Sequence, residues 1–335
     1  MSLGGMKIWN KDRTSWKFDA TCTAPAILGY GYYNTVYYTT TLNLGIKIPE
    51  GSDYYLWLAT HAAMDYLVER SQWTPRGVYY YTTRLDSNRN VLIDSHNEYG
   101  VFGHVSSNYY SLFTFPLPDK TGKGGLKFIH GNSFSTISDI SKFSFLKWKG
   151  DIDLRSGWTP SSIDSSITPN NTIVFFYLDN ETVTVHKDFD GVYRLYSSGL
   201  GEYYGVVKAK VIIFGDGGIK KSRAGVRVHN PKTKEIVFDS ANEIMVSPKV
   251  ITMVNKGLGE YTTVPGVARP MITPTQIGGE YYAGWFGSIG VNSNGTQIAP
   301  QRGRSYYVRA SHGPHWLEIK EIPVMVLDAE NYFNF

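Results

Sequence analysis

The chain has 335 residues, a formal net charge of +4 and one cysteine, Cys22. This length predicts two domains, or three small ones, with enough apolar surface to fold without disulfides or metals. The single cysteine excludes a disulfide framework within the chain and fits maturation in a reducing cytosol. Basic and acidic residues are interspersed, so no basic run predicts nucleic-acid binding.

The composition favours a β-sheet protein. Aromatic residues make up 15% of the chain, with 25 tyrosines, and Ala-rich helical stretches are nearly absent. The sequence has no stretch of about 18 apolar residues and no apolar signal region at its N-terminus. We therefore expect neither membrane insertion nor a signal peptide. We interpret residues 1–5 as an expression-tag remnant before a natural start at Met6.

Strand signals succeed one another along the chain, with turn signals typical of a β-sandwich or barrel. One segment is ambiguous, because residues 61–70 fit a helical turn or two, whereas residues 54–58 fit a strand equally well. The remaining predicted strands cover residues 30–42, 173–178, 182–187, 192–196, 205–214, 284–291, 305–310, 316–319 and 324–327.

Glycine-rich and polar segments suggest where modules meet. The run Gly-Asp-Gly-Gly at 215–218 divides a predicted N-terminal β region, 6–215, from a C-terminal β-sandwich module, 216–335. A second break is predicted near 119–125, and residues 156–171 are predicted to form a long surface loop. The predicted fold is therefore all-β, with tandem related antiparallel β-sandwich modules and little helix.

One short phrase occurs three times, at residues 6–20, 81–95 and 225–240. In each copy a short alternating strand, a polar turn and an apolar strand are followed by Asp and a small residue, which predicts a related β-hairpin. Asp at a strand end can accept the backbone N–H two residues on, an Asx turn that leads the chain out of the sheet. We therefore assign a structural turn role, and no catalytic one, to Asp19, Asp94, Ser95, Asp239 and Ser240.

The third copy carries a resemblance. Val211-Ile-Ile-Phe-Gly215, Gly225-Val-Arg-Val-His-Asn230 and Ile236-Val-Phe-Asp-Ser240 together resemble a recurrent pattern in structural proteins of tailed bacteriophage and prophage tails. Those proteins are β-sandwiches, often near the tail tip or fibres, and the other two copies of the phrase match the pattern more loosely. The resemblance implies a virion tail component without catalytic residues, made in the bacterial host cytoplasm and bound to itself or to other tail proteins.

Several residue groups resemble chemical sites, and we interpret each as structural. His312 and His315 flank a Gly-Pro turn without a further ligand at metal-binding spacing. The run Asp-Ser-His at 94–96 has the residue types of a hydrolytic triad, but neighbouring strand residues diverge. The acidic pairs at 151–153 and 188–190 resemble the opening of a calcium loop and lack its later acidic ligand. We expect no metal and no cofactor.

Tyrosine doublets are the clearest surface signal. Because strand neighbours point to opposite faces, each doublet is expected to place one ring outward, where tyrosine suits protein interfaces or sugar rings. Alternatively, the outer rings cover sheet edges or pack under loops. The doublets and one triplet are at 32–33, 37–38, 54–55, 79–81, 109–110, 203–204, 281–282 and 306–307.

The sequence is compatible with two functions. The first is a non-enzymatic tail structural protein that self-assembles or docks onto other tail proteins near the tip. The alternative is a carbohydrate-binding receptor-recognition module, or a glycan depolymerase, acting on host-surface glycan. A depolymerase needs two carboxylates facing each other in a groove, and the candidates Asp151, Asp153, Glu202 and Glu280 are scattered.

Overall fold

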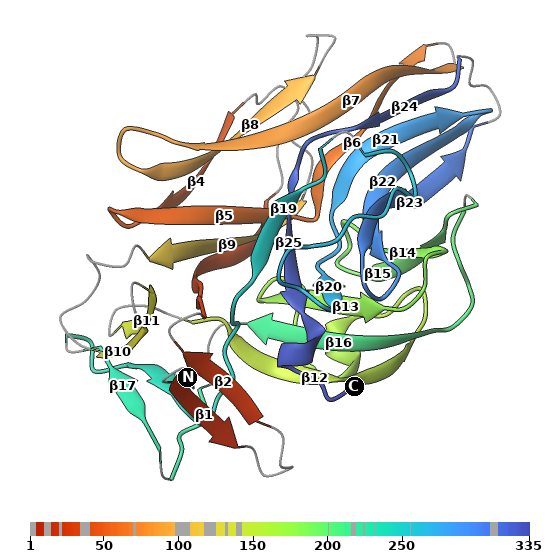
Figure 1. The fold of residues 1–335 in the computed structure, drawn as a ribbon. Helices are drawn as coiled ribbons and strands as arrows, with labels where there is room; N and C mark the ends of the chain where they lie inside the picture. Colours follow the sequence, from red (N-terminus) through yellow and green to blue (C-terminus); the bar gives the residue numbers. More distant parts are fainter. Residues whose placement is uncertain are drawn as a thin grey trace.

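The fold is almost entirely β-strand, as the composition predicted (Figure 1). No helix in the described part of the chain is long and apolar enough to cross a membrane. The computed structural model describes residues 5–9, 15–19, 22–33, 41–69, 72–97, 108–116, 125–130, 133–138, 143–199, 201–215, 219–223, 225–230, 232–254, 256–308 and 314–335.

Within these residues the largest sheet has eight strands and joins the two ends of the sequence. Its pairings are antiparallel except one, in which Gln276 and Ile277 of β21 run parallel to Thr60 and Ala62 of β6. The strand order is β23 (Ile298–Tyr307), β22 (Trp285–Ser293), β21 (Gln276–Tyr282), β6 (Thr60–Glu69), β7 (Gln72–Leu85), β8 (Asn90–Asn97) and β4 (Thr41–Lys47), and β24 (Trp316–Ile319) also pairs with β21.

Two further sheets lie against one another. The three-stranded sheet has the order β3 (Ala26–Tyr33), β9 (Asn108–Pro116) and β5 (Ser52–Leu58). The six-stranded sheet has the order β12 (Phe145–Leu154), β16 (Val207–Gly215), β13 (Thr172–Leu178), β20 (Pro270–Ile272), β25 (Pro323–Asp328) and β19 (Lys249–Thr252).

Four two-stranded hairpins and two short 3-10 turns complete the described elements. Figure 1 draws three of the hairpins, β1–β2, β10–β11 and β17–β18, at one end of the molecule. The hairpins are β1 (Gly5–Trp9) with β2 (Ser15–Asp19), β10 (Gly125–His130) with β11 (Ser133–Ser138), β14 (Val183–Lys187) with β15 (Tyr193–Ser197), and β17 (Arg227–His229) with β18 (Ile236–Asp239). The turns are η1 (Pro160–Ser162), in the predicted loop, and η2 (Ala329–Asn331).

The two faces of the three-stranded sheet are buried in different cores. Tyr55 and Trp57 of β5 pack into a core shared with the six-stranded sheet, whereas Leu56 and Leu58 pack into a core shared with β4, β7 and β8. Alternate strand residues point to opposite faces, so β5 serves both cores at once. The layers are therefore stacked face to face, which is the sandwich-type packing expected from the sequence.

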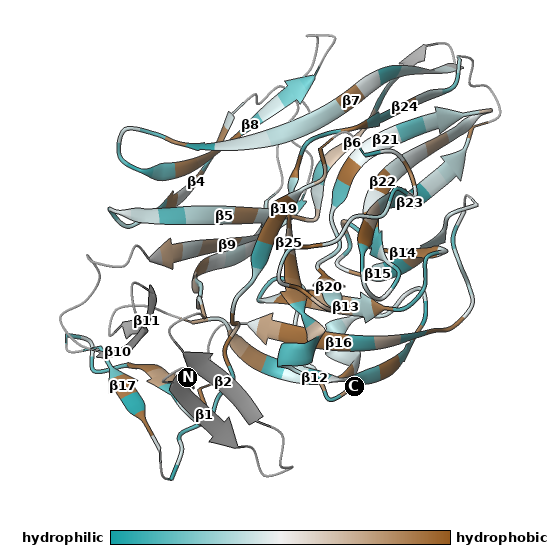
Figure 2. Ribbon diagram, in the orientation of Figure 1, coloured by the Kyte–Doolittle hydropathy of each residue, from teal (hydrophilic) through white to brown (hydrophobic). Residues whose placement is uncertain are grey.

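The central strand β13 is apolar throughout for the same reason. Phe175 points into the core shared with the three-stranded sheet, while Phe176 points into a second core closed by β14 and β15. A strand covered on both faces reads as a continuous apolar run, and Figure 2 shows hydrophobic residues along β13 and β25. Full burial of one such side chain contributes about 1.5–3 kcal/mol to the free energy of folding.

The predicted division at residue 215 stays a prediction. The six-stranded sheet takes β12, β13 and β16 from before that residue and β19, β20 and β25 from after it, and the eight-stranded sheet also spans it. Strand pairing therefore crosses this point in both sheets. Residues 216–218, and 117–124 at the second predicted break, lie outside the described residues.

Residues 61–69, for which the sequence allowed either a helix or a strand, form most of the strand β6. The strand pairs with β7 along its length and with β21 at its start. A helix needs no partner for its backbone groups, but here two neighbouring strands supply ladder partners, and the helical spacing of apolar residues is outweighed by this tertiary pairing.

The buried His186 occupies a gap left by glycines. A side chain on Gly303 would place its Cβ 1.7 Å from His186 Nε2, and one on Gly290 would place it 2.6 Å away. Neither imidazole nitrogen has a hydrogen-bond partner among the described residues, and burial lowers the pKa of His186 to about 3. The neutral ring therefore holds β14 against β22 and β23 through close packing.

We predict that Gly303→Ala lowers the free energy of unfolding by about 1–3 kcal/mol, because the new methyl group would overlap the buried His186 ring and force it to shift. Urea denaturation measures the change. Gly287→Ala, in the same sheet with its nearest contact at 3.6 Å, is the control and should be close to neutral. His186→Ala combined with Gly303→Ala should cost less than the sum of the two single changes. Equal stability of the two glycine variants would contradict this packing.

Candidate functional site

The three repeated phrases all form antiparallel hairpins. Their pairings place Asp19 opposite Gly5, Asp94 opposite Thr82, and Asp239 opposite Arg227. The phrase thus specifies a local pairing, but the surroundings of the three aspartates differ.

Asp239 lies at a strand end and is fully buried. Its carboxylate accepts hydrogen bonds from the backbone N–H of Ala241 at 2.9 Å, the Asx-turn geometry, and of Ser222 at 3.0 Å. The guanidinium of Arg227, directly opposite, donates at 2.8 Å. Ser240 completes the turn, because its hydroxyl accepts the N–H of Val226 at 3.0 Å. The buried carboxylate of Asp239 therefore closes the hairpin by accepting hydrogen bonds from two backbone N–H groups and one guanidinium.

The turn that the sequence predicted at Asp94 and Ser95 does not form. The strand β8 continues past Asp94 and Ser95 to Asn97, so the chain does not turn there. The Asp94 carboxylate instead binds the guanidinium of Arg84 at 2.6 Å and the hydroxyl of Thr41 at 2.6 Å. These contacts tie β8 to β7 and β4, which flank it on both sides. Asp19 ends β2, as the phrase predicts, and its side chain lies outside the described part of the structure.

The charge of Asp239 should make the hairpin pH-dependent. Burial alone would raise the pKa of Asp239, but hydrogen bonds from Ala241, Ser222 and Arg227 outweigh it and hold the pKa at about 2, against an ordinary value of 3.8. A lowered pKa in the folded state contributes stability above the ordinary value, and that stability is lost as the pH falls toward the folded value.

We predict that Asp239→Asn destabilises the protein by about 1–3 kcal/mol at pH 7, because Arg227 loses a charged acceptor. The difference from the wild type should shrink as the pH falls from about 4 to about 2. Denaturant titrations at several pH values measure it. Asp153→Asn, which removes an exposed ion pair with Lys208, is the control and should change little. A difference that is constant down to about pH 2 would contradict the assigned role.

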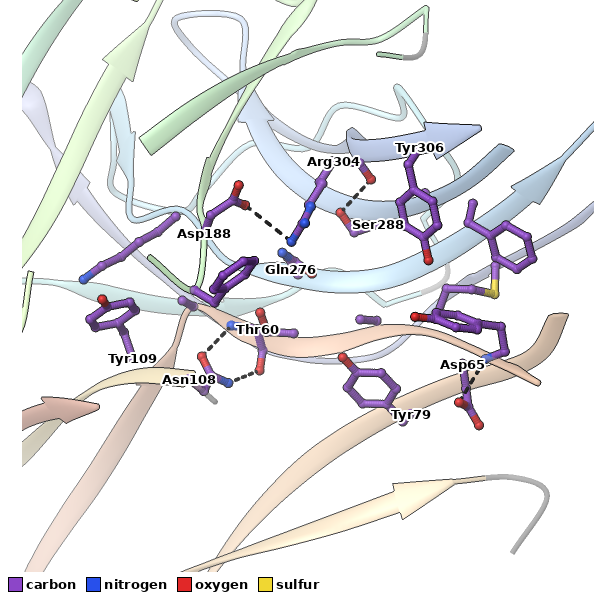
Figure 3. A pocket seen from close by; sticks show the side chains of 18 residues that line it. Thr60, Asp65, Tyr79, Asn108, Tyr109, Asp188, Gln276, Ser288, Arg304 and Tyr306 are labelled. Carbon is purple, nitrogen blue, oxygen red and sulfur yellow. Dashed lines mark hydrogen bonds and ion pairs between the residues drawn. The ribbon is translucent and has the colours of Figure 1, made fainter. Parts of the chain in front are cut away.

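A hollow lies where the eight-stranded sheet, the three-stranded sheet and the β14–β15 hairpin meet (Figure 3). Its volume is about 740 Å³, within the range of ligand sites. Asn108 of β9 fixes one wall, because its amide accepts the N–H of Thr60 at 3.1 Å and donates to the carbonyl of Thr60 at 2.6 Å. Further lining side chains are Asp65, Tyr66, Tyr79, Tyr109, Lys187, Asp188, Phe189, Gln276, Ser288, Arg304 and Tyr306.

The two carboxylate oxygens of Asp188, which lines this hollow, differ in their hydrogen bonding. Its Oδ2 accepts a hydrogen bond from Arg194 at 2.7 Å, whereas its buried Oδ1 has no hydrogen-bond partner among the described residues. The guanidinium of Arg304 lies 4.0 Å from Oδ1, beyond hydrogen-bond length. Burial raises the pKa of Asp188, against the opposing effect of Arg304 and Arg194. One carboxylate oxygen is thus left without a donor in the described part of the chain.

A second hollow, of about 500 Å³, shares Asp188, Phe189, Arg304 and Tyr306 with the first. We call the two together the aromatic groove. Phe189 is 60% exposed and Tyr204 is 78% exposed. The remaining lining residues of the second hollow are Asp190, Arg194, Tyr196, Gly201, Glu202, Trp285 and Ser305. Asp190 accepts two hydrogen bonds from Arg194, which lower its pKa.

Lys187 is buried beside the groove within aromatic rings. Its Nζ lies 4.1 Å from the ring centre of Tyr109 and 5.4 Å from that of Trp57, and donates to the carbonyl of Pro169 at 2.9 Å. The rings favour the ammonium form, but no carboxylate among the described residues is close enough for an ion pair. The cost of burying the charged form outweighs the effect of the rings and lowers the pKa of Lys187 to about 7.

Because the pKa of Lys187 falls from 10.5 to about 7 on folding, the unfolded chain binds more protons between these values. We predict that the free energy of unfolding of the wild type, minus that of Lys187→Met, rises by about 2 kcal/mol between about pH 7 and about pH 9. Urea titrations at each pH measure the difference, and Lys208→Met, at an exposed position, should show no such rise. A flat difference would mean that the lysine stays charged inside the fold.

The predicted chemical residues do not come together in the aromatic groove, apart from Asp188, Asp190 and Glu202. Asp151 and Asp153 each pair with a lysine on β16. Glu280 is buried and binds Arg302 at 2.6 Å and His315 at 3.2 Å, while His312 lies outside the described residues. No group of three or more metal-binding side chains occurs in the part of the chain that the structure describes.

The tyrosine doublets alternate as expected in part. Tyr33 is 8% exposed beside Tyr32 at 40%, and Tyr281 is 2% exposed beside Tyr282 at 47%. In the doublet at 306–307 both rings are partly exposed, and residues 37–38 lie outside the described part. Sequence reasoning missed Arg304, Gln276 and Lys187 as groove residues. The sequence signals that fell on the groove were the acidic pair at 188–190, the candidate acid Glu202 and the tyrosine groups that contain Tyr79, Tyr109, Tyr204 and Tyr306.

No match to the chain was found among curated proteins or among solved structures. A family model described as "Family of unknown function (DUF6453)" matches residues 6–311. This range takes in every residue that lines the aromatic groove. Because the match covers most of its length, the chain belongs to the DUF6453 family.

Proposed function

We propose that this protein is a non-enzymatic structural component of a bacteriophage or prophage tail, made in the host cytoplasm and bound to itself or to other tail proteins. The observation that carries the proposal is the phage-like hairpin at residues 225–240. It forms a two-stranded ribbon outside the large sheets and is anchored by Phe238 in the main core and by buried Asp239. A ribbon held so firmly presents its remaining residues to a partner.

The six-stranded sheet supports the proposal by offering a strand edge. Among the described strands β19 is terminal in the sheet order, paired with β25 on one side. Val250 on this strand is 44% exposed, and Val254 just beyond it is 47% exposed. An edge strand with exposed apolar residues is suited to pairing with another chain.

We predict that the purified protein self-associates, with a mass by light scattering at least twice the 37.6 kDa of one chain. Val250→Lys should reduce association, because a charged edge opposes strand pairing. Val206→Lys, at a similarly exposed valine outside the strands, is the control. A monomer at high concentration would contradict self-assembly. Absence of the protein from purified virions of an induced host, tested by mass spectrometry, would contradict the tail role itself.

The aromatic groove favours a second candidate function, recognition of a carbohydrate on the host surface. Aromatic side chains exposed beside polar groups suit sugar rings, which have both apolar and hydroxyl-bearing faces. Cleavage of the glycan is less well supported, because Asp188 and Asp190 are both bound to Arg194.

A further inference from the structure

We infer that the aromatic groove binds a neutral oligosaccharide, with a sugar hydroxyl between Asp188 and Arg304 and sugar rings against both Phe189 and Tyr204. This inference rests on the receptor-recognition role proposed above and is independent of the assembly role. It begins from the one carboxylate oxygen in the groove that is buried without a donor among the described residues.

The pair of Asp188 and Arg304 selects for a hydroxyl group. Asp188 Oδ1 has no donor among the described residues, and the Arg304 guanidinium, 42% exposed, offers N–H donors 4.0 Å away, too far to bond to this oxygen directly. A hydroxyl oxygen serves both groups at once, because it donates one hydrogen and accepts through its lone pairs. A buried acceptor without a donor costs about 1–3 kcal/mol, so a ligand hydroxyl that fills this place is favoured.

The neighbouring side chains extend the same preference. Gln276 is 7% exposed, and its amide makes no hydrogen bond with the described residues. It lies near Asp188 and Arg304 in Figure 3 and can both donate to and accept from a second hydroxyl.

The exposed rings match the apolar face of a sugar. Tyr306 is held by ring contacts to Phe286 at 5.9 Å and to Trp73 at 6.2 Å, so this wall is already ordered. Phe189 lies beside Arg304, 5.4 Å from its guanidinium carbon, which brings one ring next to the proposed hydroxyl site. Rings fixed before binding reduce the entropy cost of holding a ligand.

The charge of the groove favours a neutral ligand. Among its lining residues the acids Asp65, Asp188, Asp190 and Glu202 outnumber Lys187, Arg194 and Arg304. Arg194 is already neutralised by Asp188 and Asp190. An anionic glycan would therefore meet more negative than free positive charge. Two connected hollows of about 740 and 500 Å³ offer room for more than one sugar ring.

The test measures binding of maltohexaose, cellohexaose, chitohexaose and, as the anionic probe, hexagalacturonate to the full chain by calorimetry and saturation-transfer NMR. We expect saturable binding of at least one neutral hexasaccharide. Asp188→Asn and Tyr204→Ala should each weaken it about tenfold or more, corresponding to about 1.4 kcal/mol. Tyr282→Ala, at an exposed tyrosine outside the groove, should leave affinity unchanged.

The exposed position of Tyr204 keeps the test decisive if Asp188→Asn impairs folding. Three outcomes would overturn the inference: no binding of any neutral hexasaccharide, binding of hexagalacturonate alone, or neutral binding that Tyr204→Ala leaves intact. The assembly state of the same preparation is measured separately, so a groove without sugar affinity is distinguishable from failure of the tail role.

Discussion

The structure depends on burying the β14–β15 hairpin, although the last two residues of β14, His186 and Lys187, and the next residue, Asp188, are polar. Each of these side chains is nearly inaccessible to solvent. A buried polar group is costly unless its surroundings are matched to it, and here each residue is matched by a different means. Glycines make room for His186, aromatic rings enclose Lys187, and arginines face Asp188.

Strand alternation directs these residues to different neighbours. Val185 points with Val183 into the core against the six-stranded sheet, and Lys187, two residues on, reaches Trp57 of the three-stranded sheet. His186 and Asp188 point the other way, to Gly303 and Arg304 of β23. One five-residue strand and the residue after it therefore contact all three large sheets. The aromatic groove lies where these contacts end, so its walls are positioned by the core and not by loops alone.

Local features of the fold could be predicted from the sequence. The hairpins at 182–196 and 225–240, and the buried strand β13, result from alternation, turn residues and continuous apolar runs. These signals lie within a few residues of one another, where backbone pairing decides the outcome. The helix alternative at 61–70 failed because β6 pairs with β7 along its length, and the further partner at its start, near residue 276, is remote in the sequence.

The groove could not be predicted for the same reason. Asp188 and Arg304 come from separate hairpins, and Asn108 reaches Thr60 across two sheets. Nothing in the spacing of these residues reveals their distance in space. Gly303 illustrates the limit, since only the position of the His186 ring explains why that position excludes a side chain.

The repeated hairpin shows how far a phrase determines structure. Asp94 and Asp239 have the same place in the phrase and both bind an arginine of the partner strand. Opposite Asp239 the strand β17 begins at Arg227 and the chain turns, whereas β7 extends beyond the residue opposite Asp94 and pairs with residues 95–97, so β8 continues. The free energy of the ion pair is gained in both cases, so the phrase fixes pairing and charge. Whether the chain turns or continues after the aspartate depends on whether a neighbouring strand supplies partners for the next backbone groups.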